Sequence, residues 1–176
     1  MPLWESAAFV ALALTQGATG QGSATPSEAE SAFARLSALA GTWSGTWASG
    51  RAHTVTYRLS AGGTVLVETW ALGPNRESMT VYHLEGRRLL ATHYCPQGTQ
   101  PRLVMVPGRD SGRLDFTLLD GANLDVPGRS HQHSFTVWLW ASDRYERSEH
   151  YVENGAPAEV DGAPDEVVAY RRIVAP

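Results

Sequence analysis

The sequence predicts an all-β protein, an up-and-down meander barrel of about eight to ten antiparallel strands with a short N-terminal helix. Three observations predict this fold. A segment with helical spacing of apolar residues ends at Gly41, and the apolar period then changes to two. The motif Gly-Thr-Trp occurs at 41–43 and again at 45–47, which places Trp43, Gly45 and Trp47 on one face of a strand. Short alternating segments separated by turn residues then continue to the C-terminus.

Composition limits the classes of protein to consider. The chain has 176 residues, enough for one domain with a buried core. Its net charge is -4, with 14 basic and 18 acidic residues and no run of Lys or Arg, which argues against a nucleic-acid partner. Cys95 is the single cysteine, so neither an internal disulfide nor a cysteine zinc cluster can form.

The first 26 residues differ from the rest, and we expect residues 1–26 to be a secretory signal or a disordered segment before a barrel domain at 27–176. An apolar run at 7–14 precedes a small-residue, Gly-rich stretch, as in a signal, although the start lacks Lys and Arg. Export to the periplasm or the medium is therefore expected, with a cytoplasmic location as the alternative. Eight apolar residues are too few to span a bilayer, which needs about 20. The sequence leaves the oligomeric state open.

The helix is expected to begin after Ser27, a favourable N-cap residue, because acidic residues follow in the first turn. Apolar residues then recur at 32, 33, 36, 39 and 40, and Gly41 ends the helix. A single apolar face predicts that the helix packs against the barrel. We expect it to cover Trp138 and Trp140, which lie opposite the predicted inner face of their strand; the alternative is that these rings are exposed as a contact patch.

Ten strands are expected, each bounded by Gly, Pro, Asn, Asp or Ser in turns such as Gly62-Gly63 and Pro107-Gly108. Closing a meander into a barrel removes its two exposed edges, and the interior has room for side chains and one small ligand. A two-sheet sandwich is the structural alternative, but hairpin turns between nearly all neighbours favour the meander. The expected segments are 42–49, 52–60, 64–72, 77–84, 88–95, 101–106, 113–119, 131–141, 144–152 and 166–174.

A short helix leading into Gly-x-Trp and then a meander barrel resembles the calycin superfamily, which includes lipocalins, fatty-acid-binding proteins and nitrobindins. The resemblance covers residues 36–175 and implies that Trp43 plugs the closed end of a ligand-binding barrel. Three later segments resemble more narrowly an uncharacterised group of bacterial lipocalin-like proteins. They are Met79-Thr80-Val81-Tyr82-His83, Thr92-His93-Tyr94-Cys95 and Gln100-Pro101-Arg102.

Two histidines, His131 and His133, form the sharpest local pattern. At positions i and i+2 of a strand they share a face, which continues as Phe135 and is predicted to be the inner one. They are candidates for polar pocket residues or for a metal pair, with a third nitrogen from His83 or His93. The alternative is a loop at the barrel rim with two solvated histidines.

Glu68 lies in an otherwise apolar strand and has two possible environments. If Leu66 and Trp70 face the interior, Glu68 does too, and a buried carboxylate then needs a partner such as Arg102 or Arg58. If Val65 and Val67 face inward instead, Glu68 is a surface residue. The full predicted ligand-binding set is Tyr57, Glu68, His83, His93, Tyr94, Arg102, His131 and His133.

The predicted function is that of a lipocalin-like binding protein that holds a small hydrophobic or amphipathic molecule inside the barrel. No catalytic residue and no cofactor is predicted. One alternative is a haem- or metal-binding barrel that uses a histidine, because nitrobindin-like barrels bind haem through a histidine near the C-terminal strands, where His150 lies. A second alternative is a small enzyme with His93 or His133 as general base.

Overall fold

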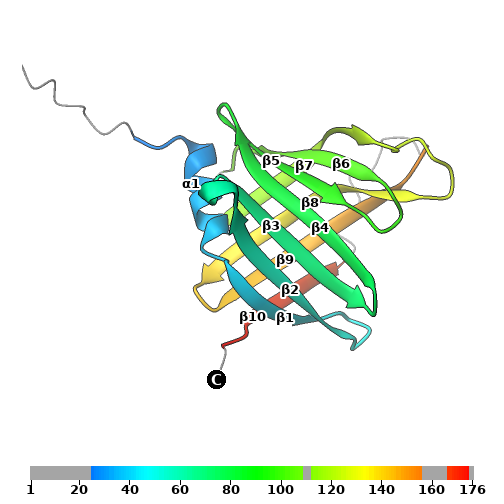
Figure 1. Ribbon diagram of the computed structural model, residues 1–176, viewed down its shortest axis with the longest axis horizontal. Helices are drawn as coiled ribbons and strands as arrows, with labels where there is room; N and C mark the ends of the chain where they lie inside the picture. The colour runs from blue at the N-terminus through cyan, green and yellow to red at the C-terminus, as the bar shows by residue number, and fades with distance from the viewer. Residues whose placement is uncertain (1–24, 109–111, 156–165, 175–176) are drawn as a thin grey trace, which may run out of the picture.

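A computed structural model describes residues 25–108, 112–155 and 166–174. In this part of the chain ten antiparallel strands form one closed barrel, in which each strand pairs with its sequence neighbours and β1 pairs with β10 (Figure 1). The predicted meander barrel is therefore confirmed. The strands are β1 (Gly41–Thr46), β2 (Ala52–Ser60), β3 (Val65–Gly73), β4 (Arg76–Glu85), β5 (Arg88–Tyr94), β6 (Gln100–Val106), β7 (Arg113–Ala122), β8 (Ser130–Ala141), β9 (Arg144–Glu153) and β10 (Glu166–Arg172).

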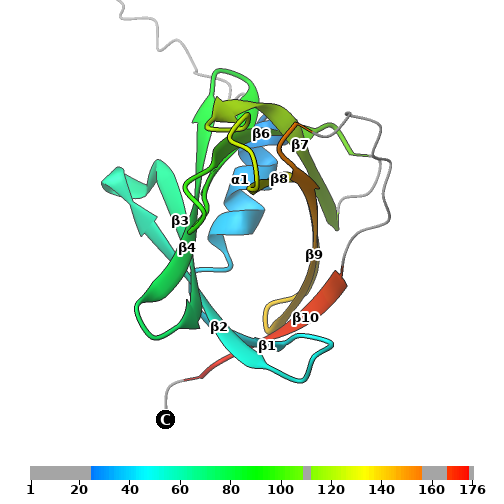
Figure 2. The ribbon, with the colours of Figure 1, turned by 90° about the vertical axis from the view of Figure 1, so that its right-hand side faces the viewer.

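The helix α1 (Glu28–Ser37) begins with a capping box. The Glu30 backbone N–H donates to Ser27 Oγ at 3.2 Å, and the Ser27 backbone N–H donates to Glu30 Oε2 at 2.7 Å. The helix lies across one end of the barrel and contacts β2, β4 and β5 (Figures 1 and 2). Its apolar face, with Ala32 and Leu36, is fully buried in the core. Among the described residues, no helix is long and apolar enough to span a membrane.

The expectation that α1 covers Trp138 and Trp140 is wrong. The helix enters the end of the barrel instead of lying on the outer face of β8, and Trp140 remains 58% exposed. Trp138 is half-buried, with the Arg113 guanidinium 5.6 Å from its ring centroid. Because α1 buries its apolar stripe inside a closed sheet, it has no second apolar face with which to cover these rings.

Trp43 closes the barrel at the α1 end, as the resemblance implied. It is completely buried, and its indole Nε1 donates to the Leu39 carbonyl at 2.7 Å. The Arg172 guanidinium lies 4.3 Å from the ring centroid and donates to the carbonyls of Ala38, Ala40 and Ser142. One arginine on the last strand therefore ties the plug, the end of α1 and the β8–β9 turn together.

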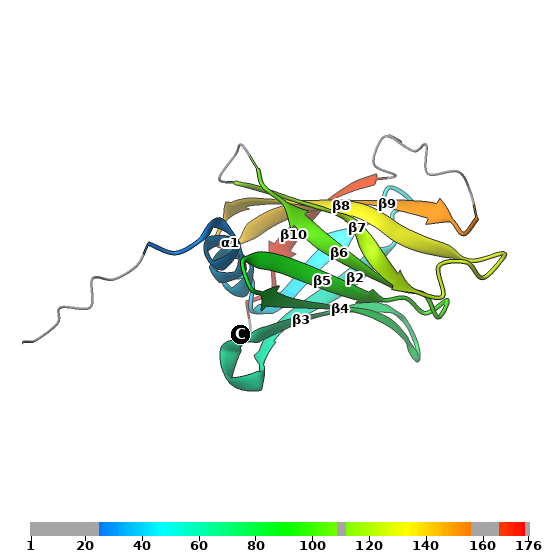
Figure 3. The same ribbon diagram turned by 90° about the horizontal axis from the view of Figure 1, so that it is seen from above.

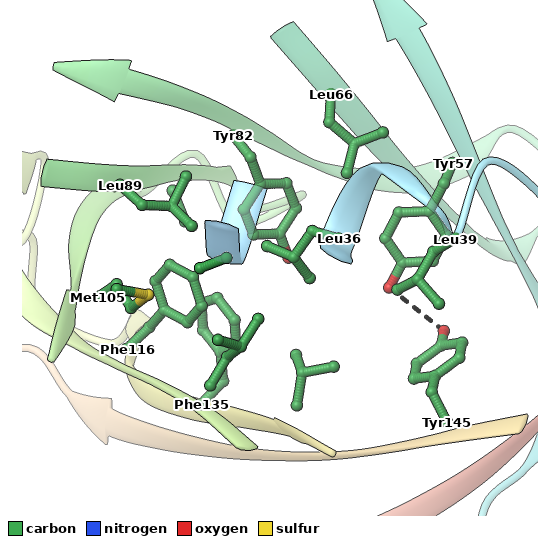
Figure 4. Packing of buried hydrophobic residues seen from close by; sticks show 14 of the residues in the cluster. Leu36, Leu39, Tyr57, Leu66, Tyr82, Leu89, Met105, Phe116, Phe135 and Tyr145 are labelled. Carbon is green, nitrogen blue, oxygen red and sulfur yellow. Dashed lines mark hydrogen bonds between the residues drawn. The ribbon is translucent and has the colours of Figure 1, made fainter. Parts of the chain in front are cut away.

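The interior next to α1 is filled by side chains, which Figure 4 shows converging from the helix and from opposite walls of the barrel. The rings of Phe116 and Phe135 stack with centroids 4.4 Å apart. At the other end the strands project beyond this core, and the β1–β2, β3–β4, β5–β6 and β7–β8 connections surround the opening (Figures 1 and 3). We call this end, opposite α1, the mouth.

Candidate ligand site in the barrel interior

Glu68 of β3 is the centre of a buried polar network deep in the barrel. Its side chain has no exposed surface, so its charge requires donors from the surrounding strands. The Tyr57 hydroxyl donates to Oε1 at 2.8 Å, and the Tyr82 hydroxyl donates to Oε2 at 2.6 Å. The Tyr57 and Tyr145 hydroxyls lie 3.3 Å apart, as the dashed line in Figure 4 marks. Burial raises the pKa of all three tyrosines well above its usual value, so they stay protonated.

Arg147 of β9 supplies the positive charge of this network. Its Nη1 lies 3.3 Å from Glu68 Oε2 and donates to the Tyr82 hydroxyl at 3.0 Å, while its Nε donates to Glu149 Oε1 at 2.7 Å. Burial by itself would lower the pKa of Arg147, but the nearby Glu68 carboxylate and the other acceptors hold that pKa well above its usual value. Arg147 is thus a permanent buried cation between two carboxylates.

His93 of β5 faces the same interior and is 2% exposed. Its Nδ1 lies 3.0 Å from Thr80 Oγ1, and its ring makes an edge contact with Tyr151, with centroids 6.4 Å apart. Burial, together with the charge of Arg147, lowers the pKa of His93 to about 4. The imidazole is therefore neutral at pH 7. Its Nε2 is buried and has no partner among the described residues.

Aromatic rings line the wall of the mouth. His53 stacks between Trp47 and Trp70, with ring centroids 3.6 Å and 5.3 Å away, and its Nε2 lies 2.9 Å from the Tyr170 hydroxyl. The pKa of His53 is lowered, first by burial. Trp70 is 5% exposed, and its indole Nε1 has no partner within the described ranges. This wall offers flat apolar surface together with one buried donor.

Two adjoining hollows open beside this wall, with volumes of about 150 and 240 Å³. They share Trp47, Trp70, Glu149 and Tyr151. Arg147 and Tyr170 line the smaller hollow, and His93 lines the larger one. The hollows therefore lie where the buried polar network meets the aromatic wall.

Tyr57, Glu68 and His93, three of the predicted site residues, come together in the interior. Of the two environments left open for Glu68, the structure has the buried one. The predicted partners of Glu68 are wrong: its cation is Arg147, not Arg58 or Arg102. Arg102 lies on the outer surface, where it forms a two-point ion pair with Asp120 at 2.6 and 2.5 Å.

His131 and His133 do not face the interior, and a β-bulge is the reason. The register of β8 against β9 shifts between Gln132 and Ser134, so that Gln132 pairs with the inward-facing Tyr151. One additional residue reverses the alternation of faces, which puts both histidines on the side away from Phe135. His131 Nδ1 instead lies 2.8 Å from Asn154 Oδ1. The predicted inner face of this segment is wrong.

The other predicted residues also lie on the outer face. His83 is half-buried on β4 next to the inward-facing Tyr82, and Tyr94 is 43% exposed. His150, on which the haem alternative depended, pairs with Ser134 and lies opposite His133 on the outside, with ring centroids 6.3 Å apart. In the described ranges, no group of three His, Cys, Asp or Glu side chains is placed to hold a metal ion.

Sequence reasoning missed Arg147, Glu149, Trp70 and Gln132. Two of them, Arg147 and Glu149, carry a signal in the sequence: in Tyr145-x-Arg147-x-Glu149-x-Tyr151, polar groups alternate at the spacing of a single strand face. Such a series is equally typical of a solvated outer face, so the sequence alone does not identify it as buried. Gln132 carries no such signal, because its orientation depends on the bulge.

Fold and site together define a closed ten-stranded barrel with a charged, hydrogen-bonded interior that is hollow near its mouth. No protein-family model matches this chain, and no curated protein does. Among solved structures, the chain is similar to a protein of unknown function from the DUF3598 family of Nostoc punctiforme, with 17% sequence identity and a TM-score of 0.47. The match covers 77% of this chain and 48% of that one, so the chain spans about half the length of that protein.

Proposed function

We propose that the protein binds one small amphipathic molecule in the hollows at the mouth of the barrel, in the manner of the calycin proteins that its sequence resembles. One observation carries this proposal. Three side chains that line the hollows, Trp70, His93 and Arg147, are more than nine-tenths buried, and each has a polar atom with no partner among the described residues. Unpaired buried polar groups cost stability, so their convergence on a cavity favours a ligand that satisfies them.

Binding is favoured over catalysis by the properties of the candidate bases. A general base works best when its pKa lies near the working pH. His93 has a pKa of about 4, and His133 lies on the outer face of the bulge, where burial lowers its pKa further from neutrality. No cofactor is part of this proposal.

Native mass spectrometry of the protein as purified tests the proposal. We expect a species heavier than the chain by the mass of one small molecule, which denaturation releases. Trp47→Ala should lose this species because Trp47 lines both hollows. Trp138→Ala, on the outer face, should retain it. If no small molecule is retained, and none from a library of amphipathic compounds raises the unfolding temperature, the proposal fails.

Export is a second, separate proposal and depends on the apolar and small-residue stretches before residue 25, which lie outside the described residues. N-terminal sequencing of the protein from its native host tests it. A start near residue 25 supports removal of a signal, whereas a start at residue 1 or 2 contradicts it.

A further inference from the structure

The charges around the mouth restrict the kind of molecule that can enter. Arg147 already faces two carboxylates, Glu68 at 3.3 Å and Glu149 at 2.7 Å. Its charge is therefore more than balanced within the protein. A carboxylate ligand would add a third negative charge beside a single buried cation and would also lose its own hydration.

The buried polar atoms that have no hydrogen-bond partner indicate which polar groups a ligand must carry. Trp70 Nε1 can only donate, and so can Arg147 Nη2. They require an acceptor oxygen. The neutral imidazole of His93 can accept at Nε2 in the tautomer whose Nδ1–H donates a hydrogen bond to Thr80 Oγ1.

From this arrangement we infer that the site selects an uncharged, planar ring that bears a carboxamide or cyclic amide group, and that it rejects the corresponding carboxylate. The inference deepens the proposed function and rests on it. The amide carbonyl accepts from Trp70 and Arg147, and the amide N–H donates to His93. An amide is the simplest uncharged group that presents an acceptor and a donor side by side.

Size and shape agree with a ring of this kind. A cavity of about 150 Å³ is large enough for a benzene-sized molecule, and the smaller hollow has a volume of about 150 Å³. Its lining includes Trp47, Trp70 and Tyr170, whose faces and edges suit contact with a flat ring. A long acyl chain does not fit, because the interior beyond the hollows is filled by the packed core around Tyr82 and Phe135.

Three probes of the same shape test the inference: benzamide, benzoate and benzamidine, together with their naphthalene counterparts. Binding is followed through the indole N–H signals in two-dimensional ¹H–¹⁵N NMR spectra, with Trp70 assigned from the signal lost in Trp70→Phe. We expect the amides to bind at least tenfold more tightly than the acids and to shift the Trp70 signal. The amidines, which lack an acceptor, should also bind at least tenfold more weakly than the amides.

Trp70→Phe keeps the aromatic wall and removes only the indole donor. It should reduce the affinity for the amides severalfold and leave the low affinity for the carboxylates unchanged. Trp138→Phe is the matched control on the outer face and should leave both unchanged. If an acid or an amidine binds at the mouth as tightly as the amides or more tightly, the inference is overturned, but the proposed ligand-binding function stands. If no probe shifts Trp47 or Trp70, and the purified protein retains no small molecule, the inference and the proposed function both fail.

Discussion

At Trp43 two interactions hold one indole ring at the closed end of the barrel. Its N–H is paired with Leu39, and its face is covered by the Arg172 guanidinium. A buried aromatic side chain contributes through its large apolar area, and a cation over the ring adds to this. Trp43 is therefore a stability residue at the opposite end of the barrel from the hollows.

Trp43→Ala should lower the free energy of unfolding by about 3–5 kcal/mol, because it leaves a cavity beneath α1. Chemical denaturation followed by circular dichroism measures the change. Trp140→Ala is the control: since that ring is 58% exposed, its loss should stay within about 0.5 kcal/mol. A cost below 1 kcal/mol for Trp43→Ala would contradict its role as the plug.

Gly45 is required because Tyr170 of the neighbouring strand lies directly over it. A Cβ at Gly45 would be 2.6 Å from Tyr170 Cε1, which is closer than any real contact. Gly45→Ala should therefore cost about 1–3 kcal/mol, as over-packed cores do. The exposed neighbour Ser44→Ala should be nearly neutral in the same denaturation assay. Equal stability of the two variants would show that the Tyr170 ring moves aside freely.

Among the elements, β3 and β9 are joined across the barrel by the pair Glu68 and Arg147. The Arg147 guanidinium on β9 neutralises the Glu68 carboxylate on β3, and both side chains are buried. Breaking such a pair by removing one partner is costly because the remaining charge stays buried. The two strands depend on each other even though they are not hydrogen-bonded neighbours in the sheet.

Arg147→Met should destabilise the protein by about 3–5 kcal/mol, since it leaves the Glu68 carboxylate without its cation. Adding Glu68→Gln to this variant should restore part of the loss, because the uncharged amide no longer needs a cation. A double-mutant cycle of unfolding free energies measures the coupling. Strictly additive losses would mean that the two side chains do not interact.

For the whole molecule, buried histidines set the response to acid. The pKa of His93 is about 4 in the folded protein, whereas an unfolded histidine has a pKa of about 6.5. The folded state therefore binds fewer protons between these values. The contribution of His93 to the free energy of unfolding is therefore complete above pH 6.5 and decreases as the pH falls towards 4.

Between pH 7 and pH 5, His93 alone should reduce the free energy of unfolding by about 2 kcal/mol. Urea denaturation across this range measures the loss. His53 and His133 act in the same direction, because their pKa values are also lowered. His93→Gln should make the pH profile flatter by the amount assigned to His93. An unaltered profile in His93→Gln would exclude a buried neutral imidazole.

Local patterns were sufficient to predict the barrel. The capping residues of α1, the alternation along each strand and the turn residues between strands all act over a few neighbouring positions, so the segments expected at 52–60 and 113–119 needed no tertiary information. The plug at Trp43 could also be placed, because it follows the helix end directly. The inward orientation of Glu68 remained one of two alternatives, since both of its strand's faces are apolar.

The site required the folded barrel, because its residues are distant in sequence and meet only across the interior. Glu68 and Arg147 are 79 positions apart, and nothing local indicates which arginine reaches a buried carboxylate. Local sequence also does not indicate the β-bulge between Gln132 and Ser134. There one inserted residue turns His131 and His133 outward and Gln132 inward. Alternation fixes faces only while the register is regular, and strand pairing across the sheet is what interrupts it here.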